Sequence, residues 1–256
     1  MANAQSQSVP VLSPEQQAKI LFTGGSGLLG SEMRKLLPAA HYPPRSEVDV
    51  TNYAQMRDYL DSHACATIVH AAAFTSPPKV DQDPRRAVDV NIRGTGNVVA
   101  LCMERGIRLL YISTDYVFCG DRGNYNEDDA VLPVNKYAWS KLGGECAVRM
   151  HDNALIVRTS FGPNVFPYAK AFVDQWTSRQ CVRRFAVKLL KLVASDLRGT
   201  IHVGGPRQTV HQYARSLDPQ REIKPLSIRE VPFRVPIDTS LDCSRYRKFE
   251  SSLDPE

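Results

Sequence analysis

The stretch Thr23-Gly24-Gly25-Ser26-Gly27-Leu28-Leu29-Gly30 decides the fold of this chain. It follows an apolar run at residues 18–23 that predicts a short buried strand, and it continues into a helical pattern of leucines. Glycines at this spacing allow a tight turn, a close approach of the backbone to a pyrophosphate, and close packing of helix on strand. A pyrophosphate would there meet the free N–H groups at the positive end of the helix. The stretch predicts a dinucleotide-binding loop, although a plain glycine-rich turn would look similar.

Strand and helix patterns alternate after this loop. The expected elements are a weak strand at 39–44 that two prolines disturb, a helix capped by Thr51 or Asn52 and ending near Leu60, a strand at 67–70, a helix at 84–104, a strand at 109–112, a helix at 135–150 and a strand at 155–157. This order predicts an α/β fold with a Rossmann-type, doubly wound parallel sheet. Ligands of such sheets bind at the carboxyl ends of the strands, where the glycine loop, residues 71–73, Thr114 and Arg158 fall.

The same pattern predicts the domain organisation. Residues 1–17 are polar and lack the basic start and apolar stretch of a signal peptide, so we expect a flexible tail. Residues 18–165 are expected to form an NAD(P)-binding Rossmann domain. Residues 166–256 would then form mainly a small C-terminal substrate-binding region, partly interleaved with the Rossmann domain.

Composition argues against several classes of protein. The net charge of +5 is mild and no lysine- or arginine-rich run accompanies it, so nucleic acid is not an expected partner. The six cysteines form neither Cys-x-x-Cys pairs nor Cys/His clusters, which argues against a zinc site or a disulfide scaffold. No apolar run approaches the length of a membrane span. The expectation is a cytoplasmic protein that binds neither membrane nor metal.

A second signature lies downstream, where Tyr137 and Lys141 stand four residues apart and follow the run Ser113-Thr114-Asp115-Tyr116-Val117-Phe118. On a helix, positions i and i+4 project from one face, so the phenol and the ammonium would be neighbours. The pair alone is weak evidence, because a chain with 10 tyrosines can contain this spacing by chance. Together with a hydroxyl at a strand end, it predicts a proton-transfer site of Thr114, Tyr137 and Lys141.

These segments resemble the extended short-chain dehydrogenases/reductases, and within them the dTDP-4-dehydrorhamnose reductases. The resemblance rests on the glycine loop and on residues 45–51, 70–75, 113–118, 125–128, 133–145 and 235–242. The run at 113–118 is the most specific part, because it separates this branch from most other dehydrogenases. The resemblance implies reduction of the 4-keto group of a nucleotide-linked 6-deoxyhexose, with dTDP-4-dehydro-L-rhamnose as the expected substrate and NADPH, or alternatively NADH, as the cofactor. Relatives are often homodimers.

Carbonyl reduction assigns a role to each of the three groups. Tyr137 would donate a proton to the carbonyl oxygen, although a tyrosine pKa of roughly 10 is too high for easy exchange near neutrality. The Lys141 ammonium should favour the phenolate and so lower that pKa. As its family counterpart does, Lys141 should also reach the nicotinamide ribose. The Thr114 hydroxyl would hydrogen-bond the carbonyl oxygen and stabilise the charge that develops there.

The resemblance also implies residues that bind the cofactor and the substrate. The expected cofactor contacts are Gly24, Ser26, Gly27, Leu28, Leu29, Gly30, Arg45, Ser46, Asp49, Val50, Ala71, Ala72, Ala73, Asn91, Tyr137 and Lys141. Asp49 and Val50 fall where the family contacts the adenine. No acid follows the weak second strand to bind a ribose 2′-hydroxyl, whereas Arg45 and Ser46 could receive a 2′-phosphate, which favours NADPH. The expected substrate contacts are Thr75, Thr114, Asp115 and Tyr116.

Two segments depart from the family. Residues 75–81 are rich in proline where relatives are more acidic and helical. The family's Asp-Gln…Pro-Thr segment has no evident counterpart, and residues 171–176 lead instead into a basic helix at 181–193. Because relatives use that region for the substrate, the sugar stays open. The alternatives are a nucleotide-sugar epimerase, a reductase of a GDP- or UDP-linked sugar, or a non-catalytic NADP-binding subunit similar to the regulatory subunit of methionine adenosyltransferase.

Overall fold

A five-stranded sheet forms the centre of the structure, a computed structural model that describes residues 12–253. The strands are β1 (Ile20–Thr23), β2 (Thr67–His70), β3 (Arg108–Ile112), β4 (Ala154–Thr159) and β9 (Gly199–Val203), in the order β1-β2-β3-β4-β9. Every adjacent pair is parallel. The predicted α/β fold with a Rossmann-type parallel sheet is confirmed.

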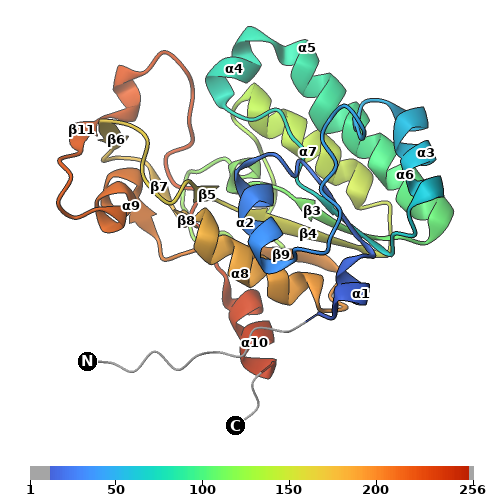
Figure 1. Cartoon of the computed structure of the whole chain (residues 1–256). Coiled ribbons are helices and arrows are strands. Elements are labelled where there is room, and N and C mark those ends of the chain that lie inside the picture. The colour runs from blue at the N-terminus through green and yellow to red at the C-terminus, as the bar shows by residue number, and fades with distance from the viewer. Residues whose placement is uncertain (1–11, 254–256) are drawn as a thin grey trace.

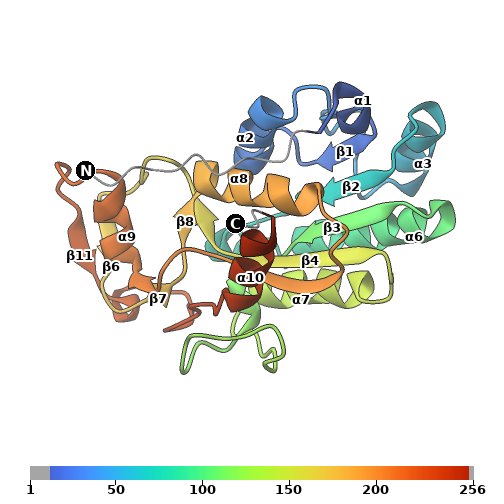
Figure 2. The same cartoon turned by 90° about the horizontal axis from the view of Figure 1, so that it is seen from below.

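Helices cover both faces of this sheet (Figures 1 and 2). One face carries α2 (Leu28–Leu36) and α8 (Val182–Val193), and the other carries α3 (Tyr53–Ser62), α6 (Thr95–Arg105) and α7 (Lys136–Val148). Successive side chains of a strand point to opposite faces, so Leu21 and Phe22 of β1 belong to different apolar cores. The sheet is therefore buried on both sides, and its open edge at the carboxyl ends is left for ligands.

The start of the chain differs from the prediction in two places. The strand expected at 39–44 is wrong, because only His41 pairs with β1, through two backbone hydrogen bonds of 2.8 Å each. Pro43 and Pro44 follow after Tyr42 and have no N–H to continue a ladder. The tail expected through Gln17 is wrong at its end, because Pro14–Gln17 form α1 behind a capping box on Ser13. Residues 1–11 of that expectation lie outside the described residues.

The middle helices also differ in detail. The helix expected at 84–104 consists of α5 (Pro84–Ala87), the π-helical segment η1 (Val88–Gly94) and α6. The proline-rich segment after residue 75 is helical and forms α4 (Pro77–Gln82), with Pro77 and Pro78 in its first turn, where a missing N–H costs nothing. Asn52 caps α3 by accepting a 3.1 Å hydrogen bond from the Gln55 N–H.

A small lobe stands beside the carboxyl ends of the sheet (Figure 1). Its elements are the strand pairs β5 (Phe161–Gly162) with β8 (Gln180–Cys181), β6 (Lys170–Phe172) with β11 (Lys224–Leu226) and β7 (Trp176–Thr177) with β10 (Gln208–Thr209), followed by α9 (Val210–Leu217) and the short helix η3 (Ile228–Glu230). The lobe and the Rossmann part exchange segments, because α8 and β9 lie between lobe elements in sequence yet belong to the main sheet. Among residues 12–253, no helix is long and apolar enough to cross a membrane.

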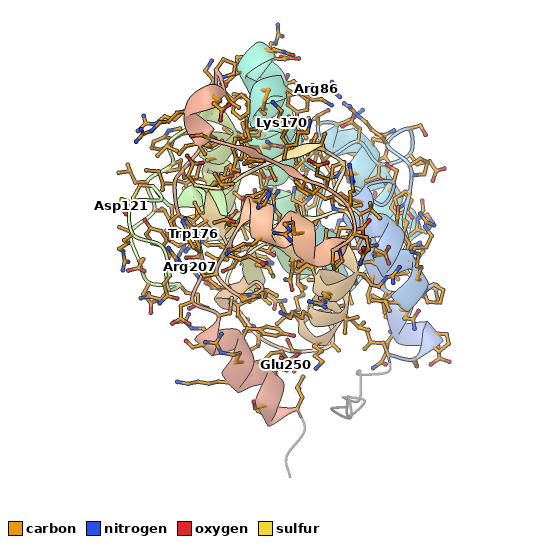
Figure 3. The ribbon with its side chains drawn as sticks, turned by 90° about the vertical axis from the view of Figure 1, so that its left-hand side faces the viewer. Arg86, Asp121, Lys170, Trp176, Arg207 and Glu250 are labelled. Carbon is orange, nitrogen blue, oxygen red and sulfur yellow. The ribbon has the colours of Figure 1, made fainter. Side chains whose placement is uncertain are left out.

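The C-terminal segment fastens the lobe to the rest of the chain. Arg207 stacks its guanidinium 3.9 Å from the ring centroid of Trp176 and forms a 2.8 Å ion pair with Asp238. Figure 3 shows Trp176 and Arg207 together on this side of the molecule. The final helix, α10 (Ser244–Ser252), is joined to α8 by a 3.0 Å ion pair between Lys191 and Glu250.

Candidate active site

Two adjoining cavities lie at the carboxyl ends of the parallel strands. The large cavity has a volume of about 500 Å³ and is lined by the ends of β3 and β4, the start of α7 and the lobe. The small cavity has a volume of about 260 Å³ and is lined by the glycine loop, Pro43, Arg45 and residues 48–50. Gly24, Gly27, Ala71 and Ala73 line both cavities. An extended ligand can therefore run from one cavity into the other past the glycine loop.

The glycine loop has the geometry that its sequence predicts. Gly24 has a φ of +77°, and an added Cβ would stand 2.8 Å from the Ala72 backbone nitrogen. An added Cβ on Gly30 would stand 2.5 Å from Gly25 Cα, so helix and loop are in direct backbone contact. Gly27 caps α2 without any side-chain hydrogen bond to the first turn of that helix. The N–H groups at this helix start therefore fit the pyrophosphate of NAD(P).

The small cavity contains the charged groups expected near the adenosine. Arg45, Asp49 and Val50 line it together with the loop. Arg45 Nε donates a 2.8 Å hydrogen bond to Asp49 Oδ2, while its side chain is 63% exposed. Burial raises the pKa of Asp49, but hydrogen bonds from Thr51 and Arg45 outweigh it and hold that pKa below its usual value. Asp49 is thus a carboxylate that holds Arg45 at the mouth of the cavity.

Three expected cofactor contacts are not on either cavity wall, and one of them, Gly30, packs against Gly25 of the loop instead. Ser46 is exposed, and its backbone carbonyl accepts a 2.6 Å hydrogen bond from Gln55. Asn91 is fully buried. Its Oδ1 accepts a 2.7 Å hydrogen bond from the Phe74 N–H, and its Nδ2 donates a 2.9 Å bond to the Phe74 carbonyl, so Asn91 fixes the loop after β2. Sequence reasoning missed Arg86, which lines the small cavity and lies 4.7 Å over the Phe74 ring. Its position on the first turn of α5 gave no signal, because that turn also faces solvent.

Thr114, Tyr137 and Lys141 come together on the wall of the large cavity, as the spacing predicts. Thr114 follows β3 and caps the single turn η2 (Asp115–Val117) by accepting a 3.2 Å bond from the Tyr116 N–H. Tyr137 and Lys141 lie one turn apart at the start of α7, which Asn135 caps through a 2.9 Å bond from the Ala138 N–H. Strand end and helix start thus hold all three groups on rigid elements.

The protonation of this group differs from the expectation. Burial raises the pKa of Tyr137 to about 12, against an opposing hydrogen bond from Thr114. Burial also lowers the pKa of Lys141 to about 7, against the opposing charge of Glu145. The Lys141 ammonium lies 4.1 Å over the ring of Tyr111. The prediction that Lys141 lowers the pKa of Tyr137 is therefore wrong for this structure, because burial dominates both groups.

Asp115 and Tyr116 are held by the lobe. Asp115 is buried and accepts hydrogen bonds from the hydroxyls of Thr114 (3.2 Å), Thr177 (3.2 Å) and Thr239 (2.7 Å). Burial raises the pKa of Asp115 despite these bonds. Tyr116 accepts a 2.8 Å bond at its hydroxyl from buried Gln175, which sequence reasoning did not assign. Asp115 thus positions Thr114, while Tyr116 and exposed Thr75 remain on the cavity wall.

The lobe adds further residues to the large cavity that the sequence did not reveal. They include Arg179, on the connection between β7 and β8, and the aromatic side chains Phe166, Tyr168 and Tyr213. Thr159, at the end of β4, has a buried hydroxyl without a hydrogen-bond partner among the described residues. Arg179, Phe166 and Tyr168 lie on connections between short strands, which carry no periodic signal, whereas Tyr213 lies on α9. No group of three or more acids, histidines and cysteines within residues 12–253 could hold a metal ion.

Comparison with known proteins places the chain in a family. The family model described as the RmlD substrate binding domain matches residues 18–188, which include the glycine loop and all three proton-transfer groups. The chain belongs to the RmlD substrate-binding domain family. The resemblance to dTDP-4-dehydrorhamnose reductases, stated above from the motifs, is thereby confirmed.

Individual relatives agree with this family. The chain is 30% identical over 235 residues to a dTDP-4-keto-6-deoxy-D-glucose reductase from Streptomyces niveus, covering 83% of this chain and 82% of that protein. It is also 26% identical to the methionine adenosyltransferase 2 subunit beta of Rattus norvegicus, covering 89% and 81%. Among solved structures, a dTDP-4-dehydrorhamnose reductase from Bacillus anthracis in complex with NADP superposes with a TM-score of 0.82 at 26% identity, covering 91% and 92%.

Proposed function

We propose that this protein is an NADPH-dependent reductase of the 4-keto group of a nucleotide-linked 6-deoxyhexose, and that it converts dTDP-4-dehydro-L-rhamnose into dTDP-L-rhamnose. The observation that carries the proposal is the meeting of Thr114, Tyr137 and Lys141 on a cavity of about 500 Å³ that continues into the glycine-loop cavity. A hydride donor held by the loop and a proton donor on α7 would then face one carbonyl group. The relatives named as dTDP-sugar reductases support the same reaction class.

The residues divide the chemistry between them. Bound along the two cavities, the nicotinamide cofactor supplies hydride to the carbonyl carbon. Tyr137 supplies the proton to the carbonyl oxygen, and its raised pKa keeps the phenol protonated at neutral pH. Thr114 turns its hydroxyl from Asp115, 3.2 Å away, toward the same oxygen and stabilises the charge that forms there. Lys141 holds a positive charge beside the site below a pH of about 7.

The small cavity supports a preference for NADPH over NADH. A 2′-phosphate carries negative charge, and Arg45 and Arg86 both line this cavity. Asp49 would compete for Arg45, since it accepts a 2.8 Å hydrogen bond from that side chain. Arg86 lies over the Phe74 ring and forms no ion pair within residues 12–253, so its guanidinium would remain available to the phosphate.

The decisive experiment is oxidation of NADPH with a panel of 4-keto sugar nucleotides linked to dTDP, GDP and UDP. We expect turnover with the dTDP-linked sugar, and loss of about 100-fold or more in kcat for Tyr137→Phe, which keeps the ring and removes the proton. The matched control is Tyr53→Phe, which removes a phenol hydroxyl on α3, outside both cavities. No turnover with any substrate, or full activity of Tyr137→Phe, would refute the proposal.

Two alternatives predict different results in the same assay. A nucleotide-sugar epimerase would retain its cofactor tightly and would show no net consumption of NADPH. A non-catalytic subunit is a second candidate, because the similarity to the methionine adenosyltransferase 2 subunit beta covers 89% of this chain. Such a subunit would bind NADP but turn over none of the sugars. Its NADP affinity would be the same in Tyr137→Phe as in the wild type.

A further inference from the structure

Arg179 is a cation of the large cavity that the reaction described so far leaves without a role. It and Lys141 are the two cationic side chains on the wall of that cavity. Arg179 is half-buried, and within residues 12–253 its side chain makes a single long hydrogen bond, 3.4 Å from Nε to Ser160 Oγ. It forms no ion pair with a described carboxylate, in contrast to Arg207 and Arg158. The two terminal nitrogens of its guanidinium are therefore free to donate.

The guanidinium lies close to the reacting groups. Burial raises the pKa of Asp115, Tyr116 and Tyr137, at the end of β3 or the start of α7, and the positive charge of Arg179 opposes that rise. The same charge opposes the rise that burial causes in the pKa of Tyr213 on α9, on the lobe side of the cavity. Arg179 thus stands between the proton-transfer group and the aromatic residues of the lobe.

We propose that Arg179 binds the diphosphate of the nucleotide-linked substrate and so fixes the sugar in front of Tyr137. This inference rests on the function proposed above, since a nucleotide-linked sugar brings a second diphosphate in addition to that of the cofactor. A guanidinium is always charged, and its planar fork matches phosphate oxygens in two parallel hydrogen bonds. The position between Tyr137 and the lobe would place a sugar at the phenol and a base among the lobe aromatics.

Charge balance in the cavity supports this assignment. The substrate contacts expected from the sequence, Thr75, Thr114 and Tyr116, carry no positive charge. Asp115, the acid on the wall, already accepts bonds from three hydroxyls. A diphosphate that entered this half-buried site without a cation would lose its hydration without compensation. Arg179 supplies that cation on the side away from the glycine loop.

The test measures binding of thymidine diphosphate and of thymidine to the NADP-loaded protein by calorimetry. Arg179→Gln should weaken thymidine diphosphate binding by about 10- to 100-fold, because a hydrogen bond to a charged group contributes about 1.5–3 kcal/mol. Thymidine binding should stay within about twofold, since it has no phosphate. The thymidine diphosphate affinity of Arg179→Lys should lie between those of the wild type and Arg179→Gln. Lysine keeps the positive charge but cannot form the two parallel hydrogen bonds of a guanidinium. Arg184→Gln, which removes an exposed arginine of α8 outside the cavity, is the matched control.

Turnover separates this role from an electrostatic effect on Tyr137. We expect Arg179→Gln to raise KM for the sugar nucleotide by about the same factor while kcat changes only a few-fold. A fall in kcat with unchanged KM and unchanged thymidine diphosphate affinity would overturn the inference, as would equal losses in Arg184→Gln or no binding by the wild type. Arg179-dependent thymidine diphosphate binding without turnover of any sugar would support the inference and refute the reductase function alone.

Discussion

Glu145→Gln tests how the buried side of α7 supports the proton-transfer site. Glu145 is fully buried one turn after Lys141, and its carboxylate pairs with Arg158, which is 1% exposed. Arg158 Nη2 lies 2.5 Å from Glu145 Oε1, and the Ser113 hydroxyl donates a 2.8 Å hydrogen bond to Oε2. The substitution keeps the shape of the side chain and removes its charge. It leaves the Arg158 guanidinium buried without a counter-ion.

The expected cost is large because neither charge can reach water. Breaking a buried ion pair from one side costs about 3–5 kcal/mol, which corresponds to a fall in Tm of roughly 6–20 °C for a chain of this size. Arg149 lies 3.2 Å from the same carboxylate but is 49% exposed, so Arg149→Gln should cost at most about 1 kcal/mol. Both variants remove an ion pair of Glu145, so the difference between their free energies of unfolding reports the effect of burying the charges.

The cost should depend on pH in a defined direction. Burial raises the pKa of Glu145, but Arg158 and Ser113 outweigh it and hold the pKa below its usual value. A carboxylate with a lowered pKa stabilises the fold above its unfolded pKa of about 4.3 and loses this effect as the pH falls through the folded pKa. The stability difference between wild type and Glu145→Gln should thus be full near pH 7 and narrow below about pH 4.

The same variant has a functional readout. The Glu145 carboxylate raises the pKa of Lys141 against burial, so its removal should move that pKa further down from about 7. The pH profile of kcat/KM should shift to lower pH in Glu145→Gln and stay unshifted in Arg149→Gln. Chemical denaturation and the pH profile are both needed. A loss below about 1 kcal/mol together with an unshifted profile would refute the reasoning.

Three further predictions concern the cofactor cavities. Gly24→Ala should weaken NADPH binding in a fluorescence titration, because an alanine at φ +77° stores about 1–3 kcal/mol of strain. The control is Gly96→Ala, where an added Cβ meets nothing within 4 Å. This variant should bind NADPH as the wild type does. Wild-type kcat/KM should fall as pH rises through about 7, where Lys141 loses its charge, and a flat profile above that pH would show that the ammonium is not needed. Arg86→Gln should lower kcat/KM for NADPH by about 10-fold and leave NADH nearly unchanged; an NADH advantage of about 10-fold in the wild type would contradict the phosphate site.

The glycine loop and the Tyr137–Lys141 pair could be predicted because their signals are local. Backbone clearance at Gly24 and Gly30 and helical spacing on α7 depend on a few consecutive residues. The strand ends were predictable as well, since apolar runs in a parallel sheet are continuous. The strand at 39–44 failed for an equally local reason, because Pro43 ended the pairing after His41.

The lobe half of the site could not be read in the same way. Gln175 and Arg179 stand on or beside strands of two residues, where no alternation of side chains can show. Their neighbours, Tyr116 and Ser160, are distant in sequence or follow another strand. The π-helical segment is a similar case, since Gly94 leaves room for Val50, which is distant in sequence: a Cβ added at Gly94 would stand 2.8 Å from a Val50 methyl group. Contacts between segments distant in sequence, not local secondary-structure propensity, determine where these residues lie.

The two cations of the large cavity respond differently to pH, and this separates binding from chemistry. Lys141 loses its proton above a pH of about 7, whereas guanidinium groups in proteins are not deprotonated. The cavity therefore retains a fixed positive charge on its lobe side when the charge beside the cofactor has gone. If Arg179 holds the diphosphate, substrate affinity should stay level across this range while kcat/KM falls. A parallel loss of affinity would instead assign the phosphate to Lys141.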